Sequence, residues 1–308
     1  MSAAVESESD TMLSCASCGA ADDVVKLKEC NGCHLVKYCS VKCQRDHRPK
    51  HKRECKKRAA ELRDELLFQQ PESSYLDDCP ICCLPLPIDL QKSFLFSCCS
   101  KYICGGCDYA NKKREIEGKL QHKCAFCRKA APKTDEVIIE QYMKRIEAND
   151  PFAMGQMGGI RYYEGDYKKA FEYCTKAAAL GDVHAHYQLS ILYNNGEGVE
   201  KDEQKELHHA EQAAIGGHPL ARYNLGCFEG RRGHYDRAVK HFIIASKLGH
   251  DESLKKVKDI YKAGFVSKDD FAAALRGHQA AVDATKSPQR EAADGYMKWL
   301  AEHVEGGG

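Results

Sequence analysis

The chain has 308 residues, which is enough for two or three structural units. Its 46 lysines and arginines nearly balance 45 aspartates and glutamates, so overall charge does not favour nucleic acid or a membrane surface as a partner. No run of about 18 apolar residues occurs, so the sequence predicts no membrane-spanning helix. Sixteen of the 18 cysteines come before residue 128, so we expect a metal-dependent N-terminal half and a second half of another kind.

The first residues, MSAAVESESD, are acidic and polar, and they lack the basic and apolar regions of a secretory signal. We therefore expect an intracellular protein, cytoplasmic or nuclear, in which residues 1–12 are disordered. A reducing compartment favours metal binding over disulfide bonds for the cysteines.

Residues 15–55 contain eight potential metal donors, arranged in pairs. Two pairs have C-x2-C spacing, and two place their donors four residues apart, on one side of a helix. The pairs are Cys15/Cys18, Cys30/Cys33, Cys39/Cys43 and His51/Cys55. Because structural zinc takes four ligands, eight donors predict two sites.

This order and spacing, with Tyr38 and the run KYCSVKCQRDHRPKHKREC, resemble a MYND finger. The resemblance implies that Cys15, Cys18, Cys39 and Cys43 bind one Zn²⁺, and that Cys30, Cys33, His51 and Cys55 bind another. His34 and His47 lie nearby, and either could replace His51. MYND fingers commonly hold proline-containing peptides in a groove near a tryptophan, but Arg48 and Pro49 stand in that neighbourhood here.

A strongly basic segment follows, with nine lysines or arginines against three acids between Arg45 and Arg63. We expect a helix there, ended by Pro71. Such a helix could contact phosphate, or it could be a solvated face that offsets the thiolates of the metal sites. Because no aromatic residues are interleaved for base stacking, we favour the second interpretation and expect no nucleic acid partner.

Residues 79–127 contain four further cysteine pairs: Cys79/Cys82, Cys98/Cys99, Cys104/Cys107 and Cys124/Cys127. A segment with so few aliphatic residues needs metal to hold it together, and eight donors again make two sites. Cys83 is also within reach, either as a spare thiol or as a substitute ligand.

The segment resembles a RING finger with eight cysteines, from Pro80 between the first ligands to the central run CCSKYICGGC. The resemblance implies a cross-brace, in which Cys79, Cys82, Cys104 and Cys107 share one zinc and Cys98, Cys99, Cys124 and Cys127 the other. It also implies that Ile81 and Leu84 dock a ubiquitin-conjugating enzyme, while Arg128 contacts ubiquitin and its carrier. The adjacent Cys98 and Cys99, and Ala125 in place of a common proline, depart from the family pattern.

From residue 134 the sequence repeats itself. Gly181, Gly217 and Gly249 mark equivalent turns, and each copy contains two segments with helical periodicity. The motifs resemble Sel1-type repeats over residues 150–265, which implies a solenoid of helix pairs. We expect a capping helix pair from Gly264, and then a last helix at residues 287–303.

Repeat arrays expose a concave face, for which several side chains are candidates: Tyr162, Tyr163, Tyr187, Tyr193, Tyr223 and His186. The alternative is that most of these tyrosines pack between helices. Cys174 and Cys227 fall within helical pattern, which is typical of core cysteines.

The predicted fold is therefore multidomain, with two small zinc-stabilised fingers followed by an all-α solenoid. Its parts are a disordered start (1–12), a MYND-like finger (13–57), a basic helix and linker (58–76), a RING-like finger (77–133), Sel1-like repeats with capping helices (134–280), and a C-terminal helix with a flexible tail (281–308). Four Zn²⁺ ions are expected as cofactors.

The leading functional hypothesis is a RING-type ubiquitin ligase that positions a charged conjugating enzyme and performs no covalent chemistry itself. Its partners would be the conjugating enzyme, ubiquitin, and an unidentified protein or peptide bound by the MYND-like finger and the repeats. The alternative is an adaptor that assembles proteins without enzymatic activity.

Overall fold

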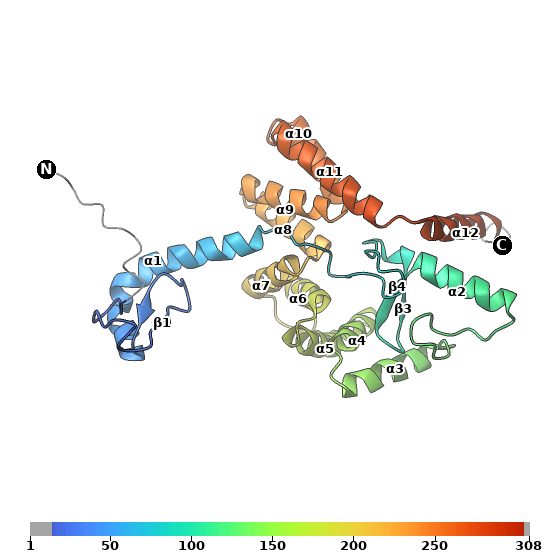
Figure 1. The fold of residues 1–308 in the computed structure, drawn as a ribbon, viewed down its shortest axis with the longest axis horizontal. Helices are drawn as coiled ribbons and strands as arrows, with labels where there is room; N and C mark the ends of the chain where they lie inside the picture. Colours follow the sequence, from blue (N-terminus) through green and yellow to red (C-terminus); the bar gives the residue numbers. More distant parts are fainter. Residues whose placement is uncertain (1–13, 305–308) are drawn as a thin grey trace. The chain divides into compact units, whose positions relative to one another are not determined.

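The computed structural model describes residues 14–304, which form two compact units divided between Gln69 and Gln70 (Figure 1). The expected disorder of residues 1–12 and the expected glycine tail lie outside the described residues. Two cysteine-rich fingers and a helical repeat array are present, as the sequence predicts.

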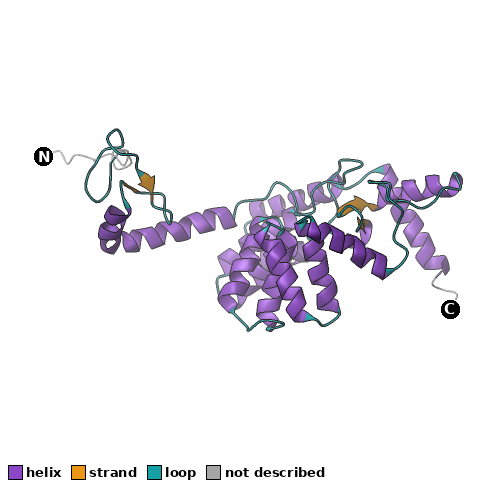
Figure 2. Cartoon of the chain, turned by 90° about the horizontal axis from the view of Figure 1, so that it is seen from below, coloured by secondary structure: helices purple, strands orange, loops and turns teal. Residues whose placement is uncertain are grey.

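The N-terminal unit combines a short hairpin with a long helix. Strands β1 (Lys28–Glu29) and β2 (Lys37–Tyr38) pair antiparallel, and α1 (Val41–Leu67) follows directly. The Ser40 hydroxyl accepts a hydrogen bond from the Cys43 amide at 3.2 Å, which caps the start of α1 and fixes Cys43 in its first turn. Figure 2 shows α1 as one continuous helix, so it includes both the end of the MYND-like segment and the basic segment.

The second unit begins with the RING-like segment. After a short 3₁₀ turn (η2, Leu90–Lys92), strands β3 (Ser93–Phe96) and β4 (Lys101–Cys104) form an antiparallel pair. Helix α2 (Gly105–Glu117) continues from β4. The buried side chains include Leu76, Leu86, Phe96, Ile103 and six cysteines, so sulfur makes up much of this core.

The remaining helices run in chain order around the repeat array. They are α3 (Asp135–Glu147), α4 (Pro151–Tyr163), α5 (Tyr167–Ala179), α6 (Val183–Asn195), α7 (Glu203–Ile215), α8 (Pro219–Arg231), α9 (Tyr235–Lys247), α10 (Asp251–Lys262), α11 (Lys268–Ala284) and α12 (Pro288–Val304). Within the array the helices pair as α4 with α5, α6 with α7 and α8 with α9.

The glycines expected at repeat turns adopt the left-handed conformation. Gly181, Gly217 and Gly249 have φ angles of 89°, 82° and 93°, which confirms the prediction of an αL turn after each helix pair. Inside the pairs, small residues permit close approach: a Cβ at Gly226 would lie 2.7 Å from the Phe242 ring. The absence of a side chain at Gly226 therefore allows α8 and α9 to approach closely.

The expected capping helix pair is a single helix instead. Residues 268–284 form α11, a continuous helix that packs on α9 and α10. Its sequence contains no proline, and Ser267 caps its start by accepting from the Asp270 amide. A Cβ at Gly277 would lie 2.6 Å from the Lys247 Cγ, so α11 packs closely on α9 at this point.

The RING-like segment packs against the start of the repeat array. Leu95 of β3 packs against a cluster that includes Tyr142 and Met157. Tyr102 of β4 meets Phe152 edge-on with ring centroids 5.5 Å apart, and the Ser97 hydroxyl donates to the Gln141 side chain at 2.6 Å. Finger and repeats therefore share buried surface within the second unit.

The segment before the RING-like finger is also held by the repeats. The Tyr75 ring stacks on His218 at 4.3 Å between centroids, and Tyr187 stacks on His218 at 4.2 Å. The Tyr75 amide donates to the Gly217 carbonyl at 3.3 Å. His218 Nδ1 accepts from the Ala221 amide, so its other nitrogen donates to His184 Nδ1 at 3.1 Å. Burial lowers the pKa of His184 to about 4, which keeps that ring neutral at pH 7.

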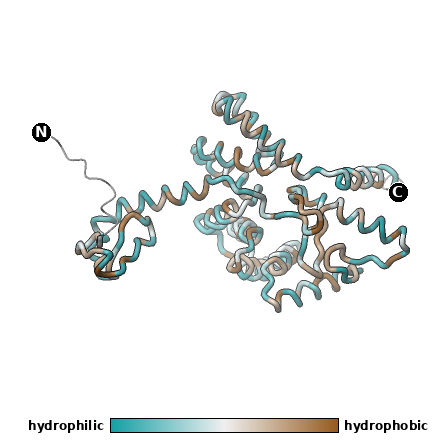
Figure 3. The backbone as a smooth tube through the Cα atoms, in the orientation of Figure 1, coloured by the Kyte–Doolittle hydropathy of each residue, from teal (hydrophilic) through white to brown (hydrophobic). Residues whose placement is uncertain are grey.

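None of the described helices is both long enough and apolar enough to cross a membrane. Hydrophilic residues recur along α1, the longest helix, in Figure 3.

We predict that Tyr75→Ala lowers the free energy of unfolding of the second unit by about 1–3 kcal/mol, because the stacked ring and its burial are lost. Thermal denaturation of the full chain, followed by far-UV circular dichroism, measures the change. Tyr75→Phe keeps the stacking and serves as the control. Equal midpoints for the two variants would show that the ring does not hold this segment.

Candidate metal centres and a basic groove

Sixteen donors converge into four groups within residues 14–304. In each group the candidate ligand atoms all lie within 4.8 Å of one another. The groups are Cys15/Cys18/Cys39/Cys43, Cys30/Cys33/His51/Cys55, Cys79/Cys82/Cys104/Cys107 and Cys98/Cys99/Cys124/Cys127. We refer to them as sites 1 to 4 in this order. These four groups are the ligand sets that the resemblances to a MYND finger and a RING finger implied.

Site 1 joins the first finger loop to the start of α1. Cys18 Sγ lies 3.5 Å from Cys39 Sγ, which in turn lies 3.5 Å from Cys43 Sγ. Because the Ser40 cap fixes the first turn of the helix, Cys43 points back toward Cys39.

Site 2 uses two consecutive turns of α1. His51 Nε2 lies 3.2 Å from Cys33 Sγ, and Cys55 Sγ lies 3.7 Å from Cys30 Sγ. The four-residue step places His51 and Cys55 on the same side of the helix, as expected.

The two alternative histidines lie outside site 2. His47 Nδ1 is 3.0 Å from the Tyr38 hydroxyl, and its ring stacks on His51. The exposed His34 side chain lies 3.1 Å from the Glu29 carboxylate. His47 therefore packs against the candidate ligand His51 and does not join its donor group.

Sites 3 and 4 are interleaved along the chain. Site 3 brings Cys82 Sγ to 3.7 Å from Cys104 Sγ, while site 4 brings Cys98 Sγ to 3.3 Å from Cys127 Sγ. The first and third pairs thus share one site, and the second and fourth pairs share the other, which is a cross-brace. Adjacent Cys98 and Cys99 both join site 4, whereas the exposed Cys83 joins none of the four groups in the described range.

The donor geometry fits zinc. With Zn–S bonds of about 2.3 Å, the corners of a tetrahedron lie roughly 3.8 Å apart. The close sulfur pairs in the four groups lie 3.3–3.8 Å apart. The hydrogen bond between Cys79 and Cys104 lowers the pKa of Cys79 and raises the pKa of Cys104, so the two sulfurs share one proton that a bound metal ion would replace.

The residues expected to dock a conjugating enzyme have different surroundings. Ile81 is 42% exposed, so its side chain is open to a partner. Leu84 is half-buried, and its carbonyl accepts from Arg290 at 3.1 Å. Arg128 is exposed but donates to the Asn111 side chain at 2.7 Å.

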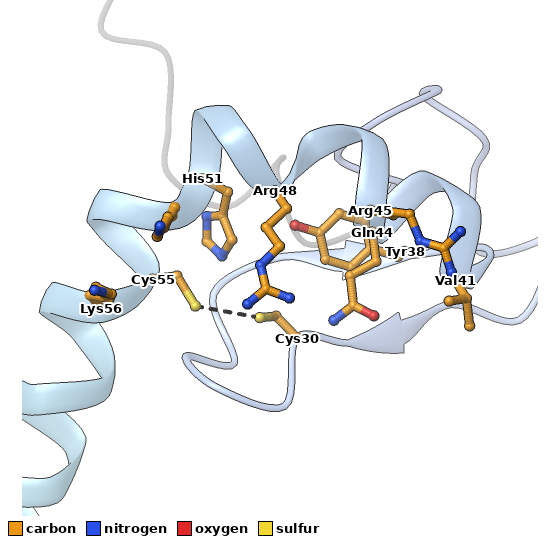
Figure 4. Close-up of a pocket in the computed structure, with 10 residues that line it drawn as sticks. Cys30, Tyr38, Val41, Gln44, Arg45, Arg48, His51, Cys55 and Lys56 are labelled. Carbon is orange, nitrogen blue, oxygen red and sulfur yellow. Dashed lines mark hydrogen bonds between the residues drawn. The ribbon is translucent and has the colours of Figure 1, made fainter.

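A cavity of about 460 Å³ lies beside site 2 in the N-terminal unit (Figure 4). It is lined by Cys30, Tyr38, Val41, Gln44, Arg45, Arg48, His51, Lys52, Cys55 and Lys56. Buried Tyr38, His51 and Cys30 form its floor, and exposed cations of α1 form its rim. Figure 4 shows Arg48 reaching from α1 toward Cys30. We call this cavity the basic groove.

The cations of the basic groove have no ion-pair partner among the described residues. Arg45, Arg48, Lys52 and Lys56 follow one another at helical spacing on α1, and none forms an ion pair with another described residue. By contrast, Arg58 pairs with Glu61 and Glu65 one turn further on. A site with three thiolates, one imidazole and Zn²⁺ has a net charge of about −1, which offsets only part of the rim.

The tyrosines considered for the concave face have mixed environments. Tyr193 is buried and stacks on His209, Tyr223 lies against Phe242, and Tyr187 packs on His218. Tyr162 packs on Tyr167 and His186 contacts His209, whereas Tyr163 is 90% exposed. Most of the set therefore packs within the array, as the alternative interpretation predicted.

Arg290 is a site residue that sequence reasoning missed. It lies in the first turn of α12, 208 residues after Cys82 of site 3, and donates to Cys82 Sγ at 3.4 Å. No local pattern marks it, because the contact depends on how the ends of the second unit pack.

Comparison with known proteins supports the finger and the repeats. Residues 15–55 match the model of the MYND finger, and residues 151–182, 183–218 and 219–250 each match that of the Sel1 repeat. Chitin synthase regulatory factor 4 of Schizosaccharomyces pombe is 26% identical over 133 residues, which are 41% of this chain and 21% of that protein. The chain thus spans about a fifth of that curated relative's length.

Two solved structures are similar to the chain. A Sel1 repeat protein from Oxalobacter formigenes has a TM-score of 0.43 at 20% identity, covering 58% of this chain and 72% of that one. A protective antigen of uropathogenic Escherichia coli with an SLR fold has a TM-score of 0.38 at 23% identity, covering 63% and 40%. The chain thus contains a zinc-binding MYND finger and a helical solenoid of Sel1 repeats, and the cysteine groups between them are compatible with a RING-like zinc site.

Proposed function

We propose that this protein is a zinc-dependent adaptor that joins protein partners through its MYND finger, its RING-like finger and its repeats. The basic groove is the observation that carries the proposal. It is a recessed site of about 460 Å³ on the MYND finger, and the cations of its rim have no ion-pair partner among the described residues.

The chemistry of the basic groove favours an acidic peptide. Arginine guanidinium groups bind carboxylates in a planar, two-point geometry, and two lysines extend the positive stripe along α1. Nucleic acid is a poorer fit, because both aromatic rings that line the groove are buried: the Tyr38 hydroxyl contacts His47, and His51 is a candidate metal ligand. A segment rich in aspartate or glutamate, held in extended form, satisfies both the charge and the size.

The relative's name is consistent with a regulatory rather than a catalytic role. That protein is described as a regulatory factor, and its similarity to this chain covers 133 residues. A comparable role for this chain is part of the proposal.

The first prediction concerns the charge of the basic groove. A fluorescein-labelled ten-residue peptide of alternating glutamate and serine should bind the full chain, and Arg48→Glu should weaken binding by roughly tenfold or more through the reversed charge. Fluorescence polarisation at two salt concentrations measures this.

Lys57→Glu is the matched control, because it makes the same change in net charge on α1 at a residue that does not line the groove. A peptide with glutamine in place of glutamate tests the charge of the ligand. Equal loss of peptide affinity in Arg48→Glu and Lys57→Glu would contradict the assignment of the basic groove as an acidic-peptide site. Equal binding of the glutamate and glutamine peptides would contradict it too.

A second candidate function is ubiquitin ligation. The observation that favours it is the cross-brace of sites 3 and 4 with Ile81 exposed beside the first pair. In this role the RING-like finger would bind a charged ubiquitin-conjugating enzyme through Ile81 and Leu84, and Arg128 would contact ubiquitin. Rate acceleration would come from positioning alone.

For this candidate we predict that the full chain forms ubiquitin chains with a suitable conjugating enzyme, and that Ile81→Ala abolishes them at unchanged zinc content. Autoubiquitination with activating enzyme, ATP and a panel of conjugating enzymes measures the activity. Ile116→Ala is the control, since Ile116 is 76% exposed on α2 and is not an expected contact. If the wild type forms no ubiquitin chains with any conjugating enzyme of the panel, the adaptor remains the proposed function.

We further predict four zinc ions per chain, one for each of sites 1 to 4. Chelation should unfold residues 15–128, since metal binding and folding are one event in fingers of this size, whereas the isolated repeat helices should keep their helical signal. Metal analysis and hydrogen exchange with and without chelator measure both effects. Retained protection of the two fingers in chelator would refute the metal assignment.

A further inference from the structure

The guanidinium group of Arg290 is buried in an unusual setting. Its residue is 8% exposed, and Nη1 donates to the carbonyls of Pro85 at 2.7 Å and Thr285 at 2.9 Å. Nη2 donates to the Leu84 carbonyl at 3.1 Å and to Cys82 Sγ at 3.4 Å. The described contacts of this cation are therefore three carbonyls and one sulfur.

A buried cation needs negative charge nearby, because removing it from water is costly unless it is paired. No carboxylate contacts Arg290 within the described range. Four thiolates around Zn²⁺ have a net charge of about −2, and Cys82 belongs to such a group. Site 3 therefore supplies the charge that makes burial of Arg290 tolerable, and Arg290 in turn neutralises part of site 3.

Helix α12 is held so that Arg290 stays in this position. The Ser287 hydroxyl accepts from the Arg290 amide at 3.2 Å at the start of the helix. Asp294 pairs with Lys92 at 2.9 Å, and the Tyr296 and Tyr109 rings lie 5.2 Å apart. Figure 1 shows α12 running beside α2, the helix that carries Cys107.

Gly106 of α2 shows how close this packing is. A Cβ at Gly106 would lie 2.9 Å from both the Cγ and the amide nitrogen of Arg290. Any larger residue there must push α12 away. By contrast, a Cβ at Gly295 of α12 would meet nothing within 4 Å.

We propose that helix α12 completes metal site 3, with Arg290 as a positioning residue that hydrogen-bonds the Cys82 thiolate and fixes the loop from Cys82 to Pro85. Residues near the C-terminal end thereby determine how tightly a finger far earlier in the chain retains its metal. This role is independent of the adaptor and ligase proposals, because it concerns metal retention and not a partner.

The test measures zinc release from the full, zinc-loaded chain. Competition with a chromogenic chelator gives the rate, and alkylation of cysteines followed by mass spectrometry gives the site. Arg290→Met keeps the length of the side chain but removes its charge and donors. We expect Cys79, Cys82, Cys104 and Cys107 to become reactive roughly 10–100-fold faster, while the cysteines of sites 1 and 2 are unchanged.

Three further variants separate this role from general destabilisation. Gly106→Ala leaves the arginine at position 290 in place but should push α12 away, so it should also speed labelling of site 3. Gly295→Ala should match the wild type. Arg290→Lys should restore part of the protection, since it keeps the charge but not the planar donor pair.

Wild-type labelling rates at site 3 in Arg290→Met would overturn the proposal. Equal acceleration at all four sites would overturn it as well, because it would show loss of the whole fold in place of a local role.

Discussion

The convergence of sulfur and nitrogen donors on four points is the constraint on which the N-terminal half depends. In the MYND finger the buried cluster contains Leu27, Tyr38 and three cysteines, which is too little apolar surface to offset the entropy of ordering the chain. In the RING-like finger six of the ten buried members are cysteines. Metal ligation therefore takes the place that a hydrophobic core has in larger domains.

The repeat array uses the opposite strategy. It buries apolar side chains such as Leu189 and Phe242 between its helices, while small residues such as Gly226 let the helices approach and glycines such as Gly217 close the turns. The array also holds two parts of the RING-like region. Tyr75, in the segment that leads into the finger, stacks on His218, and Tyr102 of β4 packs against Phe152. The second unit is thus one packed body in which a metal-dependent finger rests on a metal-independent solenoid.

Much of this could be predicted from the sequence, because ligand spacing and repeat period are local patterns. Only a few neighbouring residues are needed to recognise the four-residue step from His51 to Cys55. The same is true of the αL turn at Gly217. The adjacent Cys98 and Cys99 were ambiguous by spacing alone, and the structure places both in site 4. The single helix α11 was expected to be a pair, because helical periodicity does not by itself show where one helix ends and the next begins.

Other features had no sequence signal. Arg290 and Tyr75 act through partners far along the chain, at Cys82 and His218, and neither lies in a periodic or spaced motif. The basic groove was visible only as an excess of charge, and the sequence favoured a solvated face over a binding site. Its shape depends on how α1 packs over the loop that carries Cys30.

Zinc-edge X-ray absorption combined with metal analysis of the intact chain tests the central claim most directly. The account predicts four zinc ions per chain and an average ligand set of fifteen sulfurs to one nitrogen, since His51 is the one non-thiolate among the sixteen donors of the described groups. Fewer ions, or a clearly larger share of nitrogen or oxygen ligands, would contradict it.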